Sequence, residues 1–280
     1  MDLIPLTPVA RHENLRADCS RCVGLCCVAL AFVRSADFAF SKDAGDPCVN
    51  LDEEYRCSIH PELRQRGFKG CTVFDCFGAG QKVTQQTFDG ASWRNEPGIG
   101  QPMFAVFPRV RQLHEMLWYL NEAAALHETA SMLDELRDAY AATEALTEAT
   151  ADEILALDID AHRGAIAPLL RRASELARAG IPLSDAARRM QPGSDYMGSQ
   201  LAGRDLRGAD FRGAWLIGAD LRATDLTRAD VIGADFRDAE LGGANLAEAL
   251  YLTQFQVNAA AGDESTVLPS SLSRPSHWRH

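Results

Sequence analysis

A period of five residues runs through the stretch 197–256 and limits what this part of the chain can fold into. A large apolar side chain recurs at every fifth position: Leu201, Leu206, Phe211, Leu216, Leu221, Leu226, Val231, Phe236, Leu241, Leu246 and Tyr251. Neither an α-helix, with 3.6 residues per turn, nor a strand, with its two-residue alternation, produces this spacing. The stretch therefore predicts a solenoid in which each five-residue unit forms one wall of a coil.

A second column of small residues supports that geometry. The position two residues before an apolar centre is occupied by Ala209, Ala214, Ala219, Thr224, Ala229, Ala234, Ala239, Ala244 and Ala249. One large and one small side chain per unit can both point inward if four units close a square coil of about twenty residues. Successive coils then stack at roughly 4.8 Å, the distance between paired strands.

The repeated unit resembles that of the pentapeptide-repeat family, whose pattern is Ala-Asp/Asn-Leu-x-x. The resemblance implies a right-handed quadrilateral β-helix over residues 193–256, and it leaves a homodimer open as the assembly. With ten to eleven units the solenoid has only some two and a half coils. Its ends need caps because open inner rungs would form free edges. We expect the preceding helices to cover one end and a C-terminal tail, residues 257–280, to cover the other.

An acidic or amide residue directly precedes most apolar centres, and this column bears on function. Its members are Asp205, Asp210, Asp220, Asp225, Asp230, Asp235, Glu240 and Asn245, with Trp215 as the exception. In some pentapeptide-repeat proteins such columns imitate DNA and act on DNA gyrase, which is one alternative here. However, residues 199–250 hold nine acids and six arginines, a net charge of −3. A DNA mimic needs a stronger field, so the column favours a salt-bridged surface that contacts a protein partner.

The region 101–192 is predicted to be helical. Val110, Leu113, Leu117 and Leu120 recur at three- and four-residue steps, and a second series runs through Leu155, Ile159, Ile166 and Leu170. Ala, Leu, Glu and Arg, which are good helix formers, dominate the region. Gly180-Ile181-Pro182 predicts a stop, and Ser184 is placed to cap a short last helix. His114 and His127 lack Cys or acidic partners at ligand spacing, which favours core or surface roles.

All eight cysteines lie between Cys19 and Cys76, within a predicted Cys-rich domain, residues 1–100. The series opens with a Cys-x2-Cys-x3-Cys-Cys segment, and its members are Cys19, Cys22, Cys26, Cys27, Cys48, Cys57, Cys71 and Cys76. Thiolates suit zinc, iron or an iron–sulfur cluster. Adjacent Cys26 and Cys27 diverge, so they could serve neighbouring sites. Short apolar runs broken by polar turns predict short strands and loops around this centre.

The order of these cysteines resembles a cysteine-cluster family of zinc- or iron-chelating domains. The resemblance makes all eight cysteines metal-ligand candidates. It implies no activity, because the family has no settled function. The series of cysteines ends with Cys71-x4-Cys76, where a single Cys is typical of the family. This leaves open which of the two is a ligand. His60, three residues after Cys57, could be a ligand or could simply begin a helix. Eight thiolates could hold two four-thiolate zinc sites or one cluster with spare cysteines.

Composition and charge limit the classes of partner that this protein is expected to bind. The hydrophobic content is 46% and the charged content 24%, which is typical of a globular protein. The net charge of −11 argues against direct binding of nucleic acid or of an anionic membrane, both of which need a basic surface. No apolar run approaches a membrane span, and the first twenty residues do not read as a secretory signal. We therefore expect a cytoplasmic protein with reduced thiols rather than a disulfide framework.

The sequence thus predicts an α+β multi-module chain: a metal-organised Cys-rich lobe, central helices and a C-terminal β-helix. The leading hypothesis is a metal-binding protein whose solenoid is a protein-interaction scaffold. We found no catalytic motif. The alternatives are an enzyme that uses iron or an iron–sulfur centre for redox chemistry and a DNA-mimicking modulator of gyrase.

Overall fold

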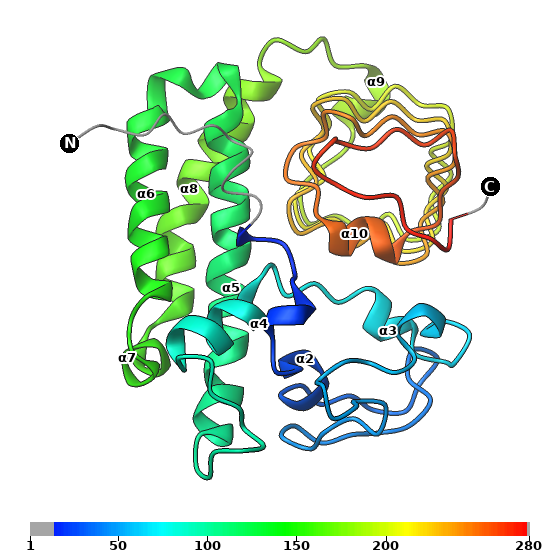
Figure 1. The fold of residues 1–280 in the computed structure, drawn as a ribbon. Helices are drawn as coiled ribbons and strands as arrows, with labels where there is room; N and C mark the ends of the chain where they lie inside the picture. The colour runs from blue at the N-terminus through cyan, green and yellow to red at the C-terminus, as the bar shows by residue number, and fades with distance from the viewer. Residues whose placement is uncertain (1–13, 279–280) are drawn as a thin grey trace. The chain divides into compact units, whose positions relative to one another are not determined.

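The computed structural model describes residues 14–278, which fall into two compact units. The first contains the described residues up to 125 together with 130–170, and the second contains 126–129 with 171–278. The Cys-rich stretch and most of the helical region therefore belong to the same unit. Figure 1 shows the two kinds of architecture, with long helices in the first unit and stacked square coils in the second.

Helices provide the regular structure of the first unit. They are η1 (Cys19–Arg21), α2 (Leu25–Val28), η2 (His60–Glu62), α3 (Lys69–Thr72), α4 (Ala79–Lys82), the π-helical turn η3 (Val83–Thr87), α5 (Gly100–Ala125), α6 (Leu133–Thr147), α7 (Ala151–Ala156) and most of α8 (Ile159–Arg178). A further 3-10 segment, η4 (His127–Met132), connects α5 to α6. The helices predicted from the apolar periodicity are confirmed.

The long helix α5 forms the centre of the first unit. Its predicted apolar stripe is buried, with Val110, Leu113 and Leu120 fully inaccessible. Residues Met103, Val106, Phe107 and Val110 pack with Leu25, Val28, Ala79 and Val83 in one apolar core. Polar contacts add to this packing: Arg163 on α8 donates to Gln112 on α5 at 2.7 Å. The long helix therefore holds the Cys-rich stretch through the short helices α2 and α4.

The Cys-rich stretch is looser than its sequence suggested. The expected strands are reduced to two isolated antiparallel bridges, Phe32 with Lys42 and Leu51 with Cys57. Stacked and edge-on rings of Phe32, Phe38, Phe40 and Phe68 form a small aromatic cluster beside them. This stretch has few backbone ladders to order it, so side chains must determine its conformation.

The second unit is a solenoid of stacked four-sided coils. Parallel bridges join residues twenty positions apart, for example Asp205 with Asp225 and Asp210 with Asp230. Every apolar centre from Leu206 to Leu246 is buried, and so are the small residues from Ala209 to Ala249. The five-residue pattern thus correctly predicted a β-helix-like coil with one large and one small inward side chain per wall. Its right-handed sense stays a prediction of the family resemblance.

Most corners of the coil are tight turns that place one residue in the left-handed region. Leu206 O accepts from Ala209 N at 3.1 Å, with Gly208 at φ +66° between them. This is a type II turn, which favours glycine at its third position. Ala223 occupies the corresponding corner at φ +54°. A Cβ in that conformation costs on the order of 1 kcal/mol, so this corner is strained.

Both ends of the solenoid are covered. At the start, α9 (Asp185–Arg188) is capped by Ser184 as predicted, and Ala187 and Met190 join the solenoid core. At the other end α10 (Gln254–Ala259) replaces part of a wall, and its capping box pairs Thr253 with Gln256. The sequence analysis did not predict this helix.

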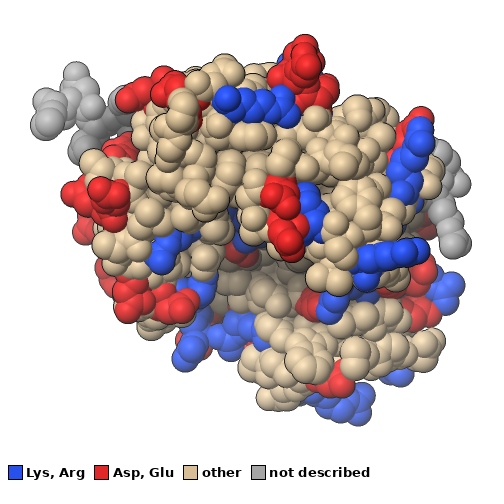
Figure 2. Space-filling model, turned by 90° about the horizontal axis from the view of Figure 1, so that it is seen from below, with Lys and Arg blue, Asp and Glu red and all other residues tan. Residues whose placement is uncertain are grey.

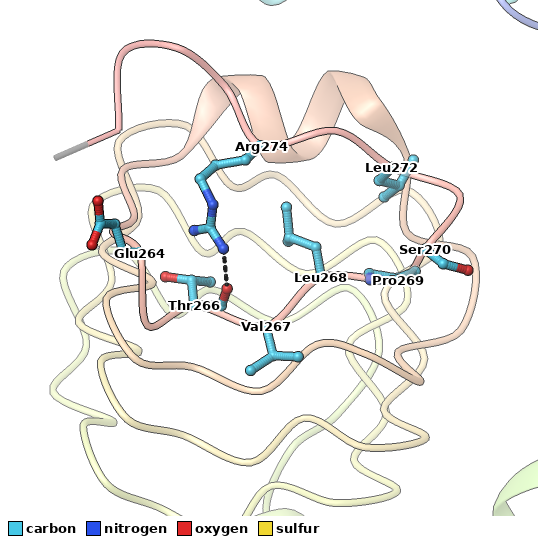
Figure 3. A pocket seen from close by; sticks show the side chains of 8 residues that line it. All are labelled: Glu264, Thr266, Val267, Leu268, Pro269, Ser270, Leu272 and Arg274. Atoms are coloured by element: carbon cyan, nitrogen blue, oxygen red, sulfur yellow. Dashed lines mark hydrogen bonds between the residues drawn. The ribbon is translucent and has the colours of Figure 1, made fainter. Parts of the chain in front are cut away.

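The final segment crosses the last coil. Trp278 is buried, and its ring lies where a Cβ on Gly262 would be, with a nearest separation of 2.5 Å. Arg274 donates to Thr266 O at 2.9 Å, as Figure 3 shows. A shallow cavity of about 390 Å³ lies here, lined by residues that include Leu268, Leu272 and Arg274. The segment closes the apolar interior of the coil.

Candidate functional site

All eight predicted ligand cysteines lie in the described part of the chain, and all eight are free thiols. Cys19 and Cys22 flank η1, Cys26 and Cys27 lie on α2, and Cys71 lies on α3. Cys76 directly precedes the turn into α4, while Cys48 and Cys57 lie in loops. Their neighbours divide them into two groups of four.

Cys22 and Cys76 are at the centre of the first group and converge on Gly80 in α4. A Cβ built on Gly80 would lie 2.8 Å from Cys22 Sγ and 3.9 Å from Cys76 Sγ. The missing side chain at Gly80 therefore makes room for the Cys22 sulfur atom, beside which the Cys76 sulfur atom lies at contact distance. Any larger residue would push the Cys22 thiol away.

The same two cysteines share a local backbone design. Each is followed two residues later by a left-handed glycine, Gly24 at φ +72° and Gly78 at φ +78°. Burial raises the pKa of the Cys22 thiol, while hydrogen bonds from the backbone N–H groups of Leu25 and Gly24 lower it. Burial raises the pKa of the Cys76 thiol to about 11, although hydrogen bonds from the backbone N–H groups of Gly80 and Gly78 act to lower it. Such N–H groups stabilise a thiolate once a cation compensates its burial.

Cys26 and Cys19 complete the first group. The pKa of Cys26 is raised well above its usual value, first by its hydrogen bond with Cys27, then by burial and by the charges of neighbouring thiolates, which include Cys22 and Cys76. The Cys26 and Cys27 sulfur atoms are 3.8 Å apart. Cys19 in turn adds to the raised pKa of Cys22. We call Cys19, Cys22, Cys26 and Cys76 the first thiol group.

The second thiol group consists of Cys27, Cys48, Cys57 and Cys71. Cys48 N–H donates to Cys27 O at 2.9 Å, and Leu51, which forms a bridge with Cys57, donates to Cys48 O at 2.9 Å. Burial, together with the charges of the other three thiolates, raises the pKa of Cys71 to about 12. Cys26 and Cys27 are assigned to different groups but connect them, because their sulfur atoms are in contact and the Cys27 charge also raises the pKa of Cys19.

Lys42 lies beside the second thiol group and was not singled out by the sequence analysis. Its side chain is buried, and Nζ donates to the carbonyls of Val28 at 3.1 Å, Asp43 at 2.8 Å and Asp46 at 2.7 Å. Burial lowers the pKa of Lys42, while the charges of Cys48, Asp46 and Cys27 oppose that shift. A buried ammonium among thiols compensates their negative charge, but a lone Lys in a polar turn gives no sequence signal for this role.

The donor chemistry fits a soft metal, but the thiols do not form a closed coordination site. Across residues 14–278, no three His, Cys, Asp or Glu side chains approach closely enough to hold a metal ion. His60 is exposed and begins η2, where its N–H donates to Cys57 O at 3.1 Å. The helix-start interpretation of His60 therefore has structural support. Cys71 and Cys76, which the sequence could not separate, lie in different groups.

His114 has a core role, as predicted. It is buried on α5, and its Nδ1 lies 2.6 Å from Phe77 O, one residue after Cys76. Burial lowers the pKa of His114 to about 4, so the ring is neutral and donates this hydrogen bond. His114 thus anchors the loop that carries Cys76. His127 is exposed.

The solenoid surface carries a ladder of ion pairs between residues two positions apart. Asp205, Asp210, Asp220 and Asp235 pair with Arg207, Arg212, Arg222 and Arg237 at 2.5–2.7 Å. Each carboxylate also accepts the backbone N–H of its arginine. The hydrogen bond from Arg222 lowers the pKa of Asp220 to about 2. The acidic column is thus largely neutralised, and Figure 2 shows acidic and basic side chains interspersed on the face in view.

Comparison with known proteins identifies the chain's relatives. It is 52% identical over 268 residues to a Bacillus subtilis protein, YybG, and the match covers 96% of each chain. The chain belongs to the YybG family. YybG is described as an uncharacterized protein, so this membership carries no activity with it.

A family model of pentapeptide repeats matches residues 205–243 in eight copies. Among solved structures, a pentapeptide repeat protein from the Arabidopsis thaliana thylakoid lumen is similar at 28% identity, over 35% of this chain and 67% of that one, with a TM-score of 0.17. The repeat part of the earlier resemblance is confirmed, whereas the cysteine-cluster resemblance stays a prediction. In the described residues no helix is both long and apolar enough to cross a membrane.

Proposed function

We propose that this YybG-family protein binds zinc or iron through its two thiol groups and uses its solenoid as a scaffold for a protein partner. The observation that carries the proposal is that eight free thiols neighbour one another, in two groups of four that meet where Cys26 and Cys27 are in contact. Four thiolates form a closed structural zinc site, and the same set can hold iron. When bound, the metal would supply the positive charge that buried thiolates lack.

Several features of the Cys-rich stretch support a role for metal in folding. Its described residues form only isolated bridges and very short helices. Its thiol groups, once bound to a metal, would therefore be its largest additional source of structural order. The N–H groups near Cys22 and Cys76 partly oppose the burial that raises the pKa of these thiols, and the hydrogen bond with Cys26 and the Lys42 charge lower the pKa of Cys27. Metal binding would draw each group together, and its free energy would become folding free energy.

The scaffold part of the proposal depends on the ion-pair ladder. Paired Asp and Arg side chains give a rigid surface of low net field, which fits specific protein contact better than imitation of DNA. The support for scaffolding over gyrase mimicry is therefore electrostatic. If micromolar protein inhibits gyrase in a supercoiling assay, gyrase mimicry would be favoured over scaffolding.

Metal analysis of full-length protein purified without oxygen and without added metal tests the metal part. We expect about two equivalents of zinc plus iron, of which Cys22→Ser/Cys76→Ser and Cys57→Ser/Cys71→Ser each remove about one. If the second pair of substitutions leaves the metal content unchanged, a single centre at the first thiol group is correct. A visible absorption band would assign iron–sulfur, and less than half an equivalent in total would contradict metal binding.

A further inference from the structure

The wall centred on Leu216 departs from the ion-pair ladder by carrying a large apolar residue at both of its positions. At four walls an Asp is followed two residues later by its Arg partner. At the wall centred on Leu216, Trp215 replaces the acid and Ile217 replaces the arginine. Trp215 is 53% exposed and Ile217 is half-buried. The most regular surface of the protein therefore contains an apolar interruption.

The neighbouring coil extends this interruption. Trp215 forms parallel bridges with Asp195 in the coil before and Asp235 in the coil after. Met197, one coil before Ile217, is 51% exposed, and the adjacent Gly198 donates to Ile217 O at 2.9 Å. Met197, Trp215 and Ile217 thus form one exposed apolar patch, which we call the Trp215 patch. Stabilising the coil does not require an apolar pair at these positions, because Asp–Arg pairs occupy them on four other walls.

Asp195 gives this patch its charge. The Asp195 side chain is exposed and accepts only the N–H of Met197 at 2.9 Å, because Met197 stands where other walls carry arginine. Asp195 forms no ion pair within the part of the chain that the structure describes. Asp235 on the other side is neutralised by Arg237 at 2.7 Å. The Trp215 patch is therefore bordered on one side by the Asp195 carboxylate, which has no ion-pair partner in the described residues, and on the other by the Asp235–Arg237 ion pair.

We propose that the Trp215 patch binds an arginine-containing segment of another protein, with its guanidinium between Trp215 and Asp195. A guanidinium stacks on an indole and forms planar paired hydrogen bonds with a carboxylate, whereas an ammonium does the second less well. Met197 and Ile217 then contact an apolar side chain next to that arginine. The segment supplies the cation that this wall lacks. This inference rests on the scaffold part of the proposed function and specifies its partner.

Panning a phage-displayed library of random twelve-residue peptides against the full-length protein tests the inference. Trp215→Asp/Ile217→Arg rebuilds the ion pair found on four other walls, so this variant keeps a native type of coil while losing the patch. Thr227→Arg, on the opposite wall, is the matched control. We expect selected peptides to share an arginine beside an apolar residue. Their affinity, measured by fluorescence anisotropy, should fall at least tenfold on the double variant, several-fold on Asp195→Asn, and remain unchanged on Thr227→Arg.

Four outcomes would overturn the inference. Peptides that bind the double variant as tightly as the wild type would place the partner on another wall, while the scaffold function would stand. Peptides in which lysine or glutamine replaces arginine without loss would exclude the guanidinium. A dimer in sedimentation that dissociates in the double variant would make a second copy the occupant. Recovery of no specific peptide would contradict the scaffold function as well.

Discussion

Asp230 lies one coil after Asp210 on the same wall, and the two carboxylates share the guanidinium of Arg212. Arg212 Nη2 lies 2.5 Å from Asp210, and its Nε lies 3.8 Å from Asp230. Asp210 also pairs with Arg178 of α8 at 3.3 Å, whereas Asp230 is completely buried with Ser174 beside it. Arg212 therefore forms a close ion pair with Asp210 and only a long one with Asp230.

This arrangement predicts a pH-dependent gain from Asp230→Asn. Burial raises the pKa of Asp230 to about 6, so the folded protein binds a proton more tightly than the unfolded chain. The contribution of Asp230 to stability therefore falls as pH rises from about 4 to about 6. We expect Asp230→Asn to raise the free energy of unfolding by roughly 1–2 kcal/mol at pH 7 and to give no gain at pH 4. Asn245 already shows that an amide fits such a position.

Urea denaturation of the solenoid unit at both pH values measures this effect. Asp205→Asn is the control, because the hydrogen bond from Arg207 lowers the pKa of Asp205 and no gain is expected at pH 7. An equal gain from Asp230→Asn at pH 4 and pH 7 would show that Asp230 is not the titrating group.

Gly80→Ala should harm the Cys-rich stretch although it lies in a helix. Alanine normally stabilises a helix by up to about 1 kcal/mol relative to glycine. Here the new Cβ would be 2.8 Å from Cys22 Sγ, so the thiol must move. We expect lower metal content, by elemental analysis, and a lower melting temperature. Gly164→Ala in α8, where no atom lies within 4 Å of the added Cβ, should instead be neutral or stabilising.

Lys42→Met should destabilise the Cys-rich stretch by roughly 1–3 kcal/mol, because it leaves the buried carbonyl of Val28 and the carbonyls of Asp43 and Asp46 without their donor. Guanidinium denaturation monitored at the helices of the first unit measures the loss. Arg66→Met, which removes an exposed pair with Glu62, should cost less than about 0.5 kcal/mol. Equal effects from the two substitutions would mean that Lys42 has no special structural role.

Ala223→Gly should stabilise the solenoid by about 1 kcal/mol, because it relieves a Cβ at φ +54°. Gly218→Ala, at φ +63° in an open corner, should cost a similar amount. Thermal unfolding followed by circular dichroism checks both substitutions. A loss at Ala223→Gly would mean that its methyl group contributes more through packing than the turn costs.

The sequence predicted the solenoid well because its order is local: each centre such as Leu216 has the same role as the one five residues away. The helix α10 was missed although Thr253 and Gln256 form a capping box, because the apolar period was followed only as far as Tyr251. The repeat pattern does not predict which structure follows the last repeat.

The cysteine stretch could be predicted only in composition. Cys26 and Cys27 are neighbours in sequence but fall into different thiol groups, and Cys71 and Cys76 separate in the same way. This division depends on how loops return to α2 and α4, which no local pattern encodes. Lys42 was missed for the same reason, since its buried carbonyl partner Val28 lies on α2, fourteen residues earlier in the chain.

The square cross-section of the solenoid restricts how this chain could lengthen. Inserting twenty residues between Leu226 and Val231 would add one full circuit and return α10 and Trp278 to the walls they now occupy. Inserting five would rotate everything downstream by a quarter turn, so that Trp278 would no longer meet Gly262. Viable length variants of this protein should therefore differ by multiples of twenty residues, not of five.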